Sequence, residues 1–156
     1  MSIIDKIKKS VEDATCLPFY YDTPETLNAR IGQLDLPCAM LDVVESGAAF
    51  DENGVIRERL TVQVLFVEKS YLDFDGIENE RKCLDKMKKH AFRWLLALRQ
   101  SDDLRLVSLG NTQRYYATQD AIVTAFSVLV TIEEIEGVCH GGQNQTNSRC
   151  HSCEGA

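Results

Sequence analysis

Apolar residues near the N-terminus recur every three or four positions, as on one face of a helix: Ile3, Ile4, Ile7 and Val11. Ser2 precedes this stripe and Asp5 follows three residues later, a pair that can cap the first turn. The pattern predicts a helix over residues 3–15. A short second helix over residues 24–31 is predicted by Thr23-Pro24-Glu25 at its start and Gly32 after its end.

Between residues 37 and 67 the pattern changes to that of two strands. The apolar run over residues 37–44 is typical of a buried strand, and Gly47 is expected to mark a bulge or the end of this strand. Asn53-Gly54 favours a tight hairpin turn, so the next strand should pair antiparallel with the first.

The strand over residues 56–67 alternates between two kinds of side chain. Its predicted core side consists of Leu60, Val62, Val64 and Phe66. Its opposite side begins with Arg59, Thr61 and Gln63. We therefore expect one face of the sheet to be buried and the other to begin polar.

A helix from residue 77 to about residue 99 follows, with Asp75 and Glu78 as a capping box. Its apolar positions repeat at helical spacing: Ile77, Leu84, Met87, Ala91, Trp94, Leu95 and Leu98. We expect this helix to cover the sheet.

The remaining strands are predicted over residues 104–109, 114–117 and 121–135, with Gly110-Asn111 and residues 118–120 as turns. The last strand carries apolar residues on both of its faces, which suggests that a second chain covers one end of it. The fold class that follows is α+β. We expect an antiparallel sheet of about four or five strands, one long helix packed on a face, and an N-terminal helix.

Composition places limits on the partners of this chain. The 156 residues carry a formal net charge of −7, and no basic run exceeds Lys88-Lys89-His90, so neither sequence-specific nucleic-acid binding nor membrane attachment is expected. The N-terminus lacks the apolar segment of a signal peptide, which predicts a cytoplasmic protein. In that compartment Cys16, Cys38 and Cys83 should be reduced and packed as small hydrophobic residues.

Candidate catalytic and metal-binding residues do not form a site with readable spacing. Asp73-Phe74-Asp75-Gly76 resembles the start of a calcium loop, but Ile77 occupies the next liganding position. His90 stands beside Lys88 and Lys89, which favours a solvated or boundary position over a catalytic one. We therefore expect no enzyme activity, no cofactor and no metal in the domain.

Two charge clusters, residues 57–59 and 133–136, lie at predicted strand ends. Such clusters are usually solvated strand edges that discourage aggregation. The alternative is a salt bridge between subunits, formed by one cluster of each kind.

The domain is expected to span residues 1–137, and residues 138–156 form a flexible tail without apolar periodicity. The tail holds Cys139, His140, Cys150, His151 and Cys153. Cys150 and Cys153 have the C-x-x-C spacing of a zinc site, whereas Cys139 and His140 are adjacent. A structural zinc and a flexible tail therefore both remain open.

The order of these elements resembles that of the phage tail terminator or tail-completion family. The resemblance covers residues 1–136 and rests on the helix at residues 3–14, the strands at 37–44 and 60–68, the helix at 77–98, and Tyr115-Tyr116 leading into the last strand. It implies a non-enzymatic ring of identical subunits that caps or completes a tail tube, with other tail or head-tail joining proteins as partners. It also implies a location in the host cytoplasm and then in the virion tail. The alternative is a small adaptor that binds a ligand or peptide between helix and sheet.

Overall fold

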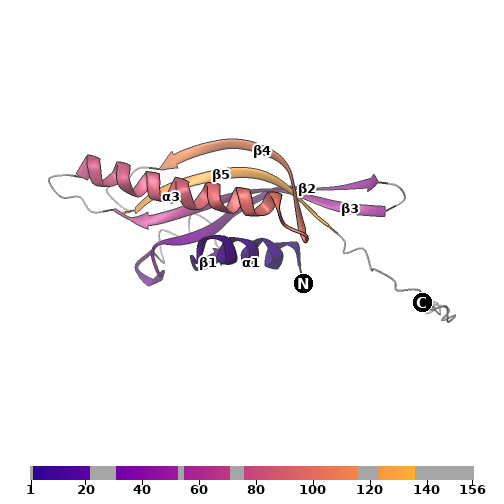
Figure 1. The fold of residues 1–156 in the computed structure, drawn as a ribbon, viewed down its shortest axis with the longest axis horizontal. Coiled ribbons are helices and arrows are strands. Elements are labelled where there is room, and N and C mark those ends of the chain that lie inside the picture. The colour runs from indigo at the N-terminus through magenta and orange to yellow at the C-terminus, as the bar shows by residue number, and fades with distance from the viewer. Residues whose placement is uncertain (1, 22–30, 53–54, 71–75, 116–122, 136–156) are drawn as a thin grey trace.

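The computed structural model describes residues 2–21, 31–52, 55–70, 76–115 and 123–135. Its described elements are two α-helices, one 3₁₀ turn and five strands, arranged as an α+β fold (Figure 1). In chain order they are α1 (Ile3–Thr15), β1 (Phe19–Tyr21), η1 (Ile31–Gln33), β2 (Cys38–Glu52), β3 (Val55–Lys69), α3 (Gly76–Arg99), β4 (Leu104–Tyr115) and β5 (Val123–Glu134). Three predicted segments lie outside the described residues: the helix over residues 24–31 except for its last position, the turn at residues 118–120, and the tail.

Helix α1 forms as its sequence predicts. The Ser2 hydroxyl accepts a hydrogen bond from the Asp5 N–H at 3.2 Å, and the Asp5 carboxylate accepts one from the Ser2 N–H at 3.1 Å. These bonds satisfy donors that have no partner within the helix. The Ser2 hydroxyl also donates to the Asp5 carboxylate at 2.7 Å, and this bond, followed by the one from the Ser2 N–H, lowers the pKa of Asp5. The helix ends at Cys16, whose left-handed backbone (φ 56°) lets its N–H reach the Glu12 carbonyl.

The five strands form one sheet in the order β1-β2-β3-β5-β4. The pairs among β2, β3, β5 and β4 are antiparallel, whereas β1 pairs parallel with β2 through Phe19↔Ala39 to Tyr21↔Leu41. The expected antiparallel sheet is therefore corrected to a mixed one. Strand β1 has only three residues, too few to show an alternating pattern in the sequence.

Strands β2 and β3 form the predicted hairpin, with Glu52 opposite Val55 beside the predicted turn. Asn53-Gly54 lies outside the described residues. Strand β2 extends well beyond the predicted residues 37–44 and pairs through Gly47, which lies opposite Leu60. The irregularities lie before this glycine, between Leu41 and Val43 and between Val44 and Ser46, so Gly47 neither ends the strand nor sits in a bulge.

Strand β4 is one strand, which corrects the prediction of a turn at Gly110-Asn111. The ladder with β5 is irregular between Leu109 and Thr112, so the extra residue is absorbed within the strand. A Cβ atom added to Gly110 would lie 3.0 Å from the Leu129 side chain. The glycine is therefore suited to a close approach of two strands and not to a turn.

Both helices pack on one face of the sheet, with side chains from α1, α3 and all five strands in a single core. Strands β3 and β5 supply Leu60, Val62, Val64, Phe66, Phe126, Val128, Val130 and Ile132. The predicted core side of the strand at residues 56–67 is therefore confirmed. Trp94 of α3 is fully buried, and its ring lies 6.1 Å from that of Phe66.

The apolar stripe of α3 is confirmed from Leu84 onward but wrong at its start. Met87, Ala91, Trp94 and Leu98 are buried and Leu95 is partly buried, whereas Ile77 is 80% exposed. Figure 1 shows the first turn of α3 extending past the ends of the strands, where no sheet lies beneath it. The period was correct, but the first turn of the helix lies beyond this end of the sheet.

Within the described part of the chain, the opposite face of the sheet is covered at one end only. Leu34 and Leu36 pack there against β2, β3 and β5 in a second cluster that includes Cys38, Met40, Leu65, Val67 and Ala125. The remainder of this face, called here the helix-free face, carries mainly polar residues. This agrees with the prediction that the side beginning with Arg59, Thr61 and Gln63 is polar.

Candidate functional site

The three cysteines outside the tail lie in different environments. Cys38 is fully buried, and desolvation raises the pKa of its thiol to about 12, so it packs as predicted and is chemically inert. Cys83 is partly buried on α3. Cys16 is exposed, which corrects the expectation of packing, because its left-handed position at the end of α1 lies outside the core.

His90 occupies the boundary position that its neighbours predicted. Its ring is partly exposed on α3, and desolvation, followed by the charges of Arg93 and Lys86, lowers its pKa. Its Nδ1 is buried without a hydrogen-bond partner among the described residues. Among the described residues, no hydrogen bond joins the ring to a nucleophile or to a carboxylate.

Within the described part of the chain, no three His, Cys, Asp or Glu side chains gather closely enough to hold a metal ion. The calcium-like segment at residues 73–75 lies outside that part. The possible zinc ligands of the tail also lie outside that part: Cys139, His140, Cys150, His151 and Cys153. A zinc site in the tail therefore stays a prediction from the sequence.

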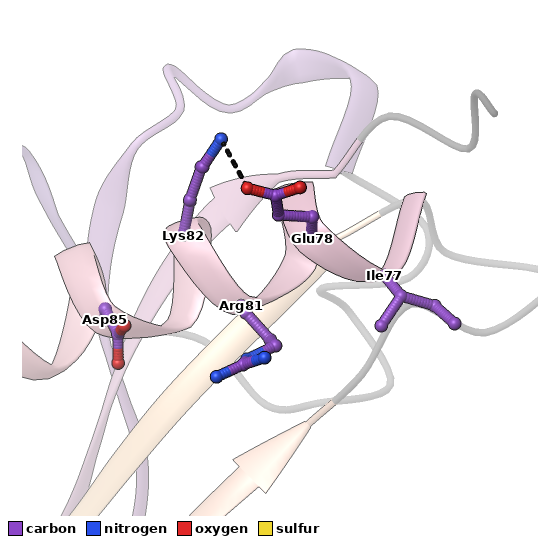
Figure 2. Close-up of a pocket in the computed structure, with 5 residues that line it drawn as sticks. All are labelled: Ile77, Glu78, Arg81, Lys82 and Asp85. Atoms are coloured by element: carbon purple, nitrogen blue, oxygen red, sulfur yellow. Dashed lines mark ion pairs between the residues drawn. The ribbon is translucent and has the colours of Figure 1, made fainter. Parts of the chain in front are cut away.

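A surface pocket lies along the first turns of α3, where Ile77, Glu78, Arg81, Lys82 and Asp85 line it (Figure 2). Glu78 and Lys82 form an ion pair one turn apart, at 3.1 Å. The lining mixes both signs of charge on one exposed helix. Such a surface is typical of a solvated helix face and selects no ligand class.

The charge clusters at residues 57–59 and 133–136 are joined within one chain by an ion pair between β3 and β5, and an arginine of β4 adds a second ion pair. Glu133 of β5 lies opposite both Arg59 of β3 and Arg105 of β4, and its carboxylate pairs with them at 3.2 and 2.5 Å. Its side chain is 0% exposed. The expectation of a solvated edge is therefore wrong for Glu133, because the two arginine side chains cover it.

Hydroxyl and amide groups continue this polar row along the helix-free face. Thr61 and Thr131 share a hydrogen bond of 3.1 Å between their hydroxyls. Gln63 donates to Ser127 at 3.0 Å and to the Tyr115 hydroxyl at 3.3 Å. These bonds join β3, β5 and β4, so the row stabilises the sheet from its uncovered side.

The β2–β3 hairpin extends beyond the rest of the fold (Figure 1). Strand β3 pairs with β5 only from Arg59 onward, and β2 pairs with β1 only through Leu41. Among the described residues, the hairpin end at residues 49–52 and 55–58, called here the arm, is therefore a two-stranded ribbon. Such a ribbon is marginally stable alone, and its edges can accept another strand.

The sheet has two open edges of different composition. The outer edge of β2 is free of a described partner strand over residues 42–52, which contain four acidic residues and no Lys or Arg. The outer edge of β4 has no partner strand among the described residues, and β4 contains two arginines and no acidic residue. Sequence reasoning missed the charge difference between these two edges because it divided β4 into two strands and ended β2 early. The charged residues themselves are visible in the sequence.

Asp42 lies where the open edge of β2 begins, at the first register irregularity. Desolvation raises the pKa of its carboxyl group. Its Oδ1 is buried and has no hydrogen-bond partner among the described residues. A carboxylate oxygen in this state is costly to the isolated fold.

No helix in the described part of the chain could cross a membrane. No protein-family model matches the sequence, and no curated protein is significantly similar to it.

Proposed function

We propose that this protein is a non-enzymatic structural protein of a phage or prophage tail, which caps or completes the tail tube by ring-like self-assembly. The observation that carries the proposal is the arm, a hairpin that extends beyond its own domain with open strand edges. A structure of this kind exposes backbone groups that another protein can pair with.

The arrangement of the two open edges favours a ring over a dimer. The β2 edge and the β4 edge lie on opposite sides of one sheet and carry charges of opposite sign. Contacts between two different surfaces of the same chain repeat head to tail and close into a ring when the rotation between copies permits. The element order on which the family resemblance rests is also present, from α1 through α3 to β5.

The overall charge suits such a ring. A net charge of −7 gives a surface that repels phosphates, as required of a channel through which DNA passes without being held. Other tail or head-tail joining proteins would then contact the ring outside the edges that join its subunits.

Light scattering and negative-stain electron microscopy of the purified chain test the proposal together. We expect a mass that is a multiple of 17.6 kDa and ring-shaped particles. A mass of one chain at every concentration, without rings, contradicts it.

A small adaptor with a ligand between helix and sheet is the second candidate. The space between α3 and the sheet is filled by fully buried side chains, among them Met87, Trp94 and Phe66. Among the described residues this candidate therefore has no supporting cavity, and self-assembly is favoured.

A further inference from the structure

We propose that the acidic outer edge of β2 in one copy pairs with the basic outer edge of β4 in the next copy, as antiparallel strands of one continuous sheet. This inference rests on the proposed self-assembly and names the surfaces that would carry it. The occupant of each edge is therefore a second copy of this chain.

The direction of the strands follows from the sheet order. Each neighbour in the series β2, β3, β5, β4 runs antiparallel to the one before it, so β4 runs opposite to β2. When copies repeat head to tail in one orientation, β4 of one copy meets β2 of the next as an antiparallel neighbour. This is the commoner kind of pair, and it requires no change within either copy.

Charge complementarity selects these two edges. Strand β2 contributes Asp42 at the start of its open edge, and β4 contributes Arg114 near its end. In an antiparallel alignment Arg114 approaches Asp42, whereas Arg105 is already paired with Glu133 of its own chain. Like edges brought together, β2 with β2 or β4 with β4, would instead oppose charges of one sign.

Asp42 and Arg114 each lack a partner within the described part of their own chain. The Asp42 carboxylate has a buried oxygen without a hydrogen bond, and Arg114 is exposed without a recorded ion pair. A contact between the two side chains would give each of them a counter-charge.

The same contact would cover apolar surface. Strand β4 exposes Val107, Leu109 and Tyr115, of which Leu109 is 52% exposed, and β2 exposes Ala49. Adding a strand beside β4 would remove part of this surface from water. Backbone hydrogen bonds and apolar burial would then act together with the charges.

The test is a charge swap followed by mixing. Arg114→Glu and Asp42→Arg are made singly, and Lys89→Glu at an exposed position of α3 is the control with the same charge change as Arg114→Glu. We expect each edge variant alone to weaken self-association at least about tenfold, because like charges then face each other, and the control to assemble as the parent does.

Mixing the two edge variants in equal amounts should restore assembly, since every contact between unlike variants again joins opposite charges. Sedimentation velocity of the single variants and of the mixture gives the comparison, and restoration also shows that both variants are folded. If the parent assembles while Arg114→Glu and Asp42→Arg assemble equally well, the edge assignment is overturned and self-assembly stands. Failure of the mixture to recover also overturns it. A parent that remains monomeric overturns both proposals.

Discussion

The indole Nε1–H of Trp94 donates a hydrogen bond to the Ser10 hydroxyl at 2.9 Å, joining α3 to α1 above the sheet. The Trp94 side chain is fully buried, and Ser10 in turn donates to the Ile7 carbonyl at 2.8 Å. A polar contact thus fixes the relative positions of two helices that otherwise meet through apolar side chains.

Ser10→Ala should lower the free energy of unfolding by about 1–3 kcal/mol, because it leaves the buried indole N–H without an acceptor. Lys9→Ala, on the exposed side of the same helix, should change it by less than about 0.5 kcal/mol. Urea midpoints of the two variants give the comparison. Equal midpoints would show that the hydrogen bond does not hold the helices together.

The orientation of α3 is tested by a second pair of residues, seven positions apart. Leu84 is only 6% exposed and Ile77 is 80% exposed, although both belong to the same sequence stripe. Leu84→Ala should cost about 2–5 kcal/mol, whereas Ile77→Ala should cost less than about 0.5 kcal/mol. Thermal or denaturant unfolding distinguishes them, and a large cost at Ile77 would place the first turn of α3 against the core.

Glu133 and Glu134 are adjacent glutamates with different surroundings. Glu133 is buried between Arg59 and Arg105, whereas Glu134 pairs with Lys6 at a partly exposed site. Glu133→Gln should cost about 1.5–3 kcal/mol, the range for hydrogen bonds to charged groups. Glu134→Gln should cost less than about 1 kcal/mol, because an ion pair near solvent contributes little. The two unfolding free energies should differ clearly, and a smaller cost at Glu133 would argue against its buried ion pairs.

Cys16 holds a backbone conformation that suits glycine better than cysteine. Cys16→Gly should raise the free energy of unfolding by about 1 kcal/mol, since the left-handed region is strained for a residue with a Cβ atom. The exposed thiol makes no described packing contribution that the change would remove. A loss of stability would indicate that α1 does not end in this conformation.

Sequence periodicity predicted the parts of the fold in which one face of an element is buried over several turns or alternations. Helix α1, the core side of β3 and the buried positions of α3 from Leu84 onward were predictable for this reason. The sequence could not show where the sheet ends, so Ile77 was misplaced. It also could not show that Gly110 serves a close approach to Leu129, because glycine is equally common in turns.

The candidate assembly surfaces were less predictable, because strand pairing decides them. The acidic residues of β2 and the arginines of β4 are visible in the sequence, but only the strand order places them on opposite edges of one sheet. Glu133 shows the same limit. Its cluster resembled a solvated strand end until pairing brought two arginines over it.

The claim that the arm mediates assembly is tested most directly by removing the arm. Residues 49–58 can be replaced by Asn-Gly, which closes a tight turn between Ala48 and Arg59, a pair that already lies opposite in the hairpin. Every pair between β3 and β5 is retained by this design. The shortened chain should therefore still fold and unfold in one cooperative transition.

The decisive measurement is the solution mass of the parent and of the arm-shortened chain, compared by sedimentation at equal concentrations. We predict an assembled parent and a monomeric arm-shortened variant that still unfolds in one cooperative transition. A parent that is monomeric, or a shortened variant that assembles as well as the parent, would contradict the account.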